Sequence, residues 1–164
     1  MNVIFLDIDG VLNCNYSTYE MTSTHSMFVQ ENKIKILKEI IDKTDAKVVL
    51  SSTWRMGWKR LELGMKDNFL AIDFIELRDK LLEFDIELYD KTPKFDAIGR
   101  RRGDEIKAWL DAHPEVEGCV IIDDLPGKYI KPCSRHLLQT SDMWGLQKKH
   151  VAAAERIMKR SIKR

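Results

Sequence analysis

The sequence lacks the features that mark membrane-spanning, secreted and disulfide-rich proteins. Only 3 cysteines occur in 164 residues, and these are Cys14, Cys119 and Cys133. Their odd number and wide spacing fit neither a disulfide framework nor a zinc site, so we expect a reducing, cytoplasmic setting. No apolar run approaches the roughly 20 residues of a membrane-spanning helix. Residues 1–10 also lack the basic region and cleavage site of a secretory signal, so we expect none.

The chain also lacks internal repeats, low-complexity segments and recognisable linkers. It is 44% hydrophobic and 32% charged, which suits one folded domain over residues 1–164 and excludes extensive disorder. The net charge is only +1, yet residues 148–164 contain seven basic residues and one acid. We predict a basic C-terminal helix over 145–164. Such a helix is either a nucleic-acid contact or an ordinary solvated face, and the sequence leaves both open.

Short apolar runs alternate with segments of helical period. Nearly continuous apolar strands separated by helices predict an α/β fold, in which a mainly parallel sheet has helices on both faces. Residues 13–30 form either a loop or a small flap, and residues 54–73 resist assignment. The expected strands are Val3–Leu6, Val48–Leu50, Ile86–Tyr89, Cys119–Ile122 and His136–Gln139. The expected helices cover 31–43, 74–84 and 103–112, with a last helix beginning near Gly145.

Reactive polar residues follow three of the expected strands directly. Ligands bind at the carboxyl ends of strands in an open parallel sheet, so these residues are expected to converge at one edge. An extended Asp7-x-Asp9 segment directs both carboxylates to the same face, and Gly10 permits the sharp turn that follows. The residues are Asp7 and Asp9 after the first strand, Ser51 and Ser52 after the second, and Asp123 and Asp124 after the fourth.

Four carboxylates at one edge repel one another unless a cation lies among them. Oxygen ligands without histidine or cysteine select a hard ion, which makes Mg²⁺ the expected metal. A cation among acids in turn favours a phosphate ligand. Hydroxyls at Ser51 and Ser52 are suited to bind the other phosphate oxygens, and Arg55 and Arg102 to balance the charge.

Each motif taken alone has a simpler interpretation. Asp-x-Asp is commonly a turn or a cap, and a serine pair is commonly the N-cap of a helix. Asp123-Asp124 before Pro126-Gly127 also suits a turn. The prediction of a site depends on all three motifs occurring in order, each directly after an apolar strand.

This pattern resembles the haloacid dehalogenase (HAD) superfamily of phosphotransferases over nearly the whole chain. The matching segments are FLDIDGVLN (5–13), VVLSSTWR (48–55), an arginine at the start of RGDEIKAWL (102–110) and VIIDD (120–124). Together with KTP (91–93) and QT…GLQ (139–147), they are similar to the small HAD domains of RNA-repair proteins. Those domains resemble the phosphatase half of polynucleotide kinase-phosphatases. The resemblance implies a Rossmann-like sheet, and the short spacing between the motifs leaves room for a minimal cap or none.

The resemblance also implies roles for individual residues. Asp7 would be the nucleophile that forms an aspartyl-phosphate, and Asp9 the general acid and base. Ser51 would bind the transferring phosphoryl group, and Arg102 would offset its charge, with Lys91 or Lys94 as alternates. Mg²⁺ would be held by the Asp7 carboxylate, the Asp9 backbone carbonyl, Asp123 and Asp124. Further candidate substrate-binding residues are Ser52, Arg55, Gly10 and Lys91.

Too few residues lie between the motifs for a full cap domain, which suggests an open site. We therefore expect a Mg²⁺-dependent phosphatase acting on nucleic-acid ends, chiefly 3′-phosphates. The alternatives are a nucleotidase or small-molecule phosphatase, and an adaptor that binds phosphate without turnover. Trp109 is expected in the core. Candidate contacts to a polymer are Arg55, Lys59, Arg60 and the basic tail for phosphates, and Trp54, Trp58 or Tyr16 for bases.

Overall fold

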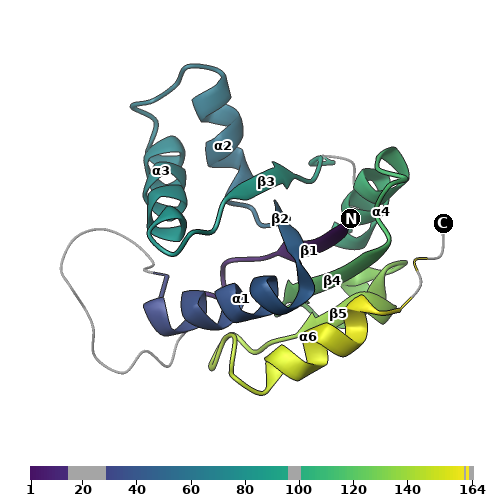
Figure 1. The fold of residues 1–164 in the computed structure, drawn as a ribbon. Helices are drawn as coiled ribbons and strands as arrows, with labels where there is room; N and C mark the ends of the chain where they lie inside the picture. Colours follow the sequence, from purple (N-terminus) through teal and green to yellow (C-terminus); the bar gives the residue numbers. More distant parts are fainter. Residues whose placement is uncertain (15–28, 96–100, 161, 163–164) are drawn as a thin grey trace.

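The sheet has five parallel strands in the order β3-β2-β1-β4-β5. It belongs to a computed structural model that describes residues 1–14, 29–95, 101–160 and 162. The predicted α/β fold with a parallel sheet and helices on both faces is confirmed (Figure 1). The strands are β1 (Asn2–Leu6), β2 (Ala46–Leu50), β3 (Leu88–Lys91), β4 (Gly118–Asp123) and β5 (Leu137–Gln139).

Helices connect the strands and cover the sheet. They are α1 (Glu31–Thr44), α2 (Arg55–Glu62), α3 (Phe69–Leu82), α4 (Arg102–Ala112), α5 (Gly127–Ile130) and α6 (His150–Met158). A short 3₁₀ helix, Ser134–His136, precedes β5. In the described residues, no helix is long and apolar enough to cross a membrane.

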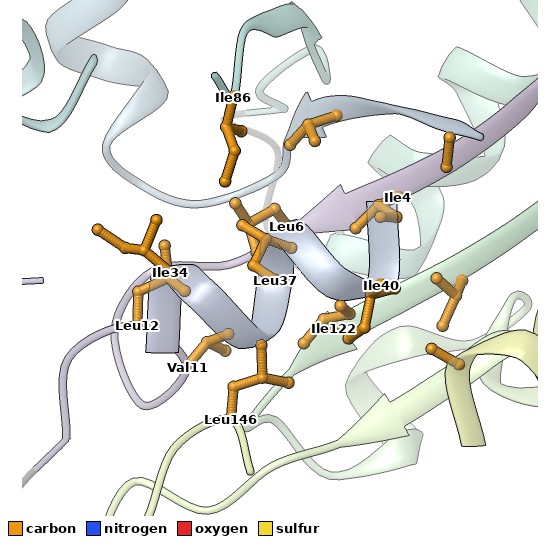
Figure 2. Close-up of a cluster of buried hydrophobic side chains, with 14 of the residues drawn as sticks. Ile4, Leu6, Val11, Leu12, Ile34, Leu37, Ile40, Ile86, Ile122 and Leu146 are labelled. Atoms are coloured by element: carbon orange, nitrogen blue, oxygen red, sulfur yellow. The ribbon is translucent and has the colours of Figure 1, made fainter. Parts of the chain in front are cut away.

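The two faces of the sheet bury alternate residues of each strand, as the twofold period of a strand requires. Ile4 and Leu6 of β1 pack with Leu37 and Ile40 of α1 on one face, which Figure 2 shows together with Ile122 of β4. The helices α3 and α6 also contribute to this cluster. We call this side of the sheet the α1 face.

The opposite side, the α4 face, buries the intervening strand residues. Val3 and Phe5 of β1 pack there with Ile106 and Trp109 of α4. The Trp109 ring meets Phe5 edge-on at a centroid distance of 5.3 Å. The prediction that Trp109 belongs to the core is confirmed.

Several predicted boundaries were wrong. The last helix begins at His150 rather than near Gly145, because Gly145 has a φ of 59° and the Leu146 N–H donates to the carbonyl of Val11. The third strand is Leu88–Lys91 rather than Ile86–Tyr89, since the chain is still turning at Asp85, where φ is 55°. Residues 54–73 hold α2 and the start of α3. Most of the segment 13–30 lies outside the described residues.

Candidate active site

The hydrogen-bond ladders of the sheet continue one residue beyond the strand ends. The N–H of Asp7 donates to Ile122 at 3.0 Å, that of Ser51 to Leu6 at 2.9 Å and that of Thr92 to Leu50 at 3.0 Å. The registers Leu6↔Leu50, Leu6↔Ile122 and Leu50↔Lys91 extend in the same way. Thr92, Ser51, Asp7 and Asp123 therefore form a row across the carboxyl edge of the sheet.

Successive side chains of a strand point to opposite faces of the sheet, and the side chains of this row point toward the α4 face. The residues just before it, Leu6, Leu50 and Ile122, are all buried on the α1 face. Their successors therefore point the other way, toward the start of α4. That start is held close because Gly103 faces the end of α5, where an added Cβ would lie 2.1 Å from the carbonyl oxygen of Ile130. This packing brings Arg102 to the row.

Three of the four predicted carboxylates gather at this edge. Oxygens of Asp7, Asp123 and Asp124 all lie within 4.8 Å of one another. Arg102 joins them: its Nη1 lies 2.8 Å from Asp7 Oδ2 and donates to Asp123 Oδ2 at 2.7 Å. The structure thus brings together most of the residues that the sequence motifs singled out.

The electrostatics of this group show an excess of negative charge. Burial, followed by the neighbouring Asp7, raises the pKa of Asp123 to about 6 against the opposing effect of Arg102. Burial and Asp7 also raise the pKa of Asp124. Burial disfavours the Arg102 cation, but Asp7 and Asp123 outweigh it and raise the pKa of that guanidinium. One arginine therefore does not neutralise the three carboxylates.

This donor set fits a magnesium ion. Carboxylate oxygens alone, without nitrogen or sulfur ligands, are the donors that hard divalent cations prefer. A cation there would relieve the repulsion from Asp7, which adds to burial in raising the two pKa values. Gly10 makes room for the group: its φ is 73°, and an added Cβ would lie 2.5 Å from Asp124 Oδ2.

Gly10 has a structural role rather than offering its backbone to a substrate. Its N–H donates to Asn13 Oδ1 at 3.1 Å, and its carbonyl accepts from Thr140 Oγ1 at 2.8 Å. Both polar groups are used within the protein. Gly10 therefore shapes the turn after β1.

Asp9 lies apart from the carboxylate group. Its Oδ1 accepts from Asn13 Nδ2 at 2.8 Å, and its Oδ2 accepts from Trp54 Nε1 at 3.1 Å. The expectation of a shared cluster of four carboxylates is therefore wrong, because these two donors hold the Asp9 side chain elsewhere. The expected metal contact through the Asp9 backbone carbonyl stays a prediction.

The two serines after β2 have different environments. Both are fully buried, and Ser51 Oγ has no hydrogen-bond partner within the described residues. Ser52 Oγ accepts from the N–H of Trp54 at 3.4 Å, at the start of α2. Ser51 thus offers an uncommitted hydroxyl beside Asp7. Ser52 closes a local turn ahead of α2 and is not its N-cap, because that position is Trp54, without a side-chain cap.

Arg55 is placed differently from the prediction. It is 5% exposed, and its Nη2 donates to Glu105 Oε2 at 2.6 Å in a buried ion pair. Its Nη1 donates to the carbonyls of Ser51 and Ser52. Glu105 Oε1 also accepts from the N–H of Phe95 at 3.0 Å. Arg55 therefore ties β2 to α4 instead of facing a substrate.

Lys91 is directed away from the row. Its register partner Leu50 lies on the α1 face. Lys91 Nζ donates to Glu62 at 2.5 Å and lies 4.5 Å from the centroid of Trp58. Arg102, rather than Lys91, is the cation in contact with Asp7. The other alternate, Lys94, is exposed.

The candidate contacts to a polymer are only partly near the site. Trp58 stacks on Phe74 at 5.2 Å as part of the core, whereas Trp54 reaches Asp9. The end of α6 lies at the opposite edge of the sheet, since Met158 contacts Gly118 at the start of β4. Figure 1 likewise shows the end of α6 on the same side as the N-terminus. Tyr16 lies outside the described residues.

Sequence reasoning missed the partners that hold the site. Three of these residues lie inside the motifs that carry the resemblance, namely Asn13, Thr92 and Glu105. A lone polar residue in a sequence does not show which group it will contact in the fold. Trp54 was singled out only as a stacking candidate. The pairing of Arg55 with Glu105 joins residues 50 positions apart, which only the fold reveals.

The chain belongs to the family of HAD domains in Swiss Army Knife RNA repair proteins, whose model matches residues 3–151. This match confirms the resemblance stated from the sequence motifs and includes every element from β1 to the start of α6. No curated protein and no solved structure matches the chain. The family supports a general assignment to HAD-type phosphatases.

Proposed function

We propose that the protein is a Mg²⁺-dependent phosphomonoester hydrolase that acts on 3′-phosphate ends of nucleic acids through an aspartyl-phosphate on Asp7. One observation carries the proposal. The Asp7 carboxylate lies beside those of Asp123 and Asp124, contacts Arg102, and neighbours the uncommitted Ser51 hydroxyl along the sheet edge. That arrangement provides a nucleophile, a cation site and donors for phosphate oxygens in one row.

The first step is the attack of Asp7 on phosphorus. A bond forms between the carboxylate oxygen and phosphorus, while the bond from phosphorus to the ester oxygen breaks. Asp9 in its protonated form donates its proton to the departing oxygen, which leaves as a hydroxyl. Arg102 and Ser51 hold the non-bridging phosphoryl oxygens, whose charge they help to balance.

The second step releases phosphate. Asp9, now a carboxylate, removes a proton from a water molecule that attacks phosphorus and restores Asp7. Asn13 and Trp54 donate to the two Asp9 oxygens, so Asp9 has to exchange one of these bonds for the leaving oxygen, and later for the water, in each transfer. Asp7, Asp123 and Asp124 would hold Mg²⁺, which supplies neutralising charge for the carboxylates and the bound phosphate.

The family and the connection between β2 and β3 support a polymer end as substrate. The family is described by its occurrence in RNA repair proteins. In the described part of the chain, α2 and α3 are the helices between β2 and β3, and Phe74, Leu77 and Leu81 of α3 pack into the main core. These helices therefore belong to the main domain and form no separate cap. An edge without a cap among the described residues suits a phosphate at the end of a long molecule.

Phosphate release from a 3′-phosphorylated oligonucleotide and from the matching mononucleotide, with Mg²⁺ or EDTA, tests the proposal. We expect release chiefly from the oligonucleotide, only with Mg²⁺, and at least a thousandfold slower (roughly, from the loss of a nucleophile) in Asp7→Asn. Asp111→Asn is the matched control, because Asp111 is exposed and pairs with Lys107.

Three outcomes would contradict the proposed function. Preference for the mononucleotide would favour a nucleotidase with the same mechanism. Binding of phosphate without release from either substrate would favour an adaptor. Equal release by wild type and Asp7→Asn would remove Asp7 from the reaction altogether.

A further inference from the structure

The hydroxyl of Thr92 is buried without a partner. Thr92 directly follows β3 and is 2% exposed, and its Oγ1 has no hydrogen-bond partner within the described residues. The other buried threonines in the described residues differ. Thr44 Oγ1 donates to the carbonyl of Ile40 at 2.7 Å, and Thr140 Oγ1 donates to that of Gly10 at 2.8 Å. Thr92 is thus an exception that needs a physical reason.

Burying a hydroxyl without a hydrogen bond destabilises a protein. A valine has nearly the same shape and would avoid that cost. Ser51 has the same unfavourable burial, because its hydroxyl is also buried and unpaired. Two such hydroxyls on neighbouring strands indicate a place where a polar ligand supplies the missing partners.

The sheet places the two hydroxyls side by side. The ladder joins Leu50 to Lys91, and the Thr92 N–H then donates to Leu50, so Thr92 is the neighbour of Ser51. Adjacent strands lie about 4.8 Å apart, a distance that two hydroxyls can bridge through one tetrahedral anion. Both residues follow positions that face α1, which directs them to the α4 face together with Asp7.

We propose that Thr92 donates its hydroxyl hydrogen to an oxygen of the bound phosphoryl group, as a second donor beside Ser51. The row Thr92, Ser51 and Asp7 then binds the phosphate from the β3 side, opposite to Asp123. This inference deepens the proposed function, on which it rests for the identity of the ligand as a phosphate.

Thr92→Val tests the proposal through two readouts, the affinity for inorganic phosphate in the presence of Mg²⁺ and the thermal unfolding midpoint without ligand. Titration calorimetry should show about tenfold weaker phosphate binding, the size of one lost hydrogen bond to a charged group. The midpoint should stay the same or rise, because the variant removes an unpaired buried hydroxyl. Thr92→Ser keeps the hydroxyl and should retain phosphate binding.

Thr44→Val is the matched control. It removes a hydroxyl that has a partner, so its midpoint should fall by a few degrees, roughly 2–4 °C, while its phosphate affinity stays at the wild-type value. Unchanged phosphate affinity in Thr92→Val would overturn the proposal. So would a fall in its midpoint like that of Thr44→Val, because the hydroxyl would then have a structural partner.

The phosphate titration separates this proposal from the proposed hydrolase. If the wild type binds phosphate through Thr92 but hydrolyses no ester, the Thr92 proposal stands and the hydrolase fails. If the wild type hydrolyses the oligonucleotide and Thr92→Val binds phosphate equally well, the hydrolase stands and the Thr92 proposal fails.

Discussion

Arg102 and Arg55 both pair with carboxylates beside the same edge of the sheet, but their surroundings differ in charge. Arg102 lies beside a group of three carboxylates, and two of them, Asp7 and Asp123, raise the pKa of its guanidinium against the opposing effect of burial. Arg55 meets one carboxylate, that of Glu105, and burial lowers its pKa despite that partner. The first group has surplus negative charge, whereas the second is matched one to one.

This difference in charge balance distinguishes a ligand-binding site from a purely structural contact. A buried pair that is matched in charge needs no further ion to balance it, and it fixes β2 against α4. An unmatched group of acids gains stability from a cation and, through that cation, attracts an anion. The sequence presents both arginines next to motif residues, so only their partners distinguish the two roles.

Breaking the matched pair should give the largest effect. Arg55→Met leaves Glu105 buried without its partner, so we expect the free energy of unfolding to fall by about 3–5 kcal/mol. Urea unfolding measures this loss. In the double variant with Glu105→Leu, most of it should return, since no unpaired charge remains. A loss below about 1 kcal/mol for the single variant would show that the pair is not the support described here.

Removing the other arginine should affect the reaction more than the fold. Arg102→Gln removes the cation that contacts Asp7, and we expect a rate about a hundredfold lower, or about 2.7 kcal/mol of transition-state stabilisation. Steady-state kinetics on the 3′-phosphorylated oligonucleotide measures the change. The control is Arg101→Gln at the neighbouring position, where Nη1 donates to the carbonyl of Lys128 and lies on the exposed surface. Equal losses in both variants would contradict a specific role for Arg102.

A magnesium ion should stabilise the unmatched group selectively. At a concentration about 100 times its dissociation constant, Mg²⁺ should raise the free energy of unfolding by about 2.7 kcal/mol, and EDTA should reverse the gain. Asp124→Asn removes one ligand and should reduce that gain, whereas Asp111→Asn on the exposed surface should not. If Mg²⁺ left the unfolding midpoint of the wild type unchanged, the three carboxylates would not be a metal site.

His136 should give the smallest effect, because it is a single buried group with no carboxylate partner among the described residues. Its Nδ1 contacts the carbonyl of Cys119 at 3.2 Å, and burial, with Arg135 and Arg160 nearby, lowers its pKa below the usual 6.5. The unfolded chain therefore takes up a proton below about pH 6.5 before the folded protein does. The contribution of His136 to the free energy of unfolding should then fall with decreasing pH, by less than about 1.4 kcal/mol per pH unit, while the raised pKa of Asp123 acts in the opposite direction over the same range.

Denaturant unfolding between pH 7 and pH 5 measures this slope. His136→Asn keeps a donor toward the Cys119 carbonyl and has no titrating ring, so its slope should be smaller than that of the wild type. A wild-type slope that the substitution leaves unchanged would assign the pH dependence to other groups. His150 is the first of these, because burial lowers its pKa as well.

The sequence predicts most of the sheet because its signals are local. Apolar runs such as Val3–Leu6 and Cys119–Ile122 are long enough to identify β1 and β4, and the acids that follow them mark the carboxyl edge. The start of α6 was not predictable in this way, because the contact between Leu146 and Val11 joins segments far apart in the chain. The later start of β3 depends on the positive φ of Asp85, which no residue pattern in the sequence predicted.

The site residues likewise include some that the sequence predicts and some that it does not. Asp7, Asp123, Asp124 and Arg102 come together as the motifs indicate, because strand ends of a parallel sheet meet by geometry. Asp9 and Arg55 do not follow the prediction, since Trp54 and Glu105 hold them elsewhere. Residue type shows what a side chain can do, and only tertiary contacts show which of those roles remains available.

The most direct test of the account is to look for phosphate on Asp7. Wild type and Asp7→Asn are mixed with an oligonucleotide carrying a radiolabelled 3′-phosphate and Mg²⁺, and the reaction is quenched with acid within one turnover. The account predicts label on the wild-type chain, mapped to the peptide that contains Asp7, and none on the variant. Release of labelled phosphate by the wild type without label on Asp7 would contradict it.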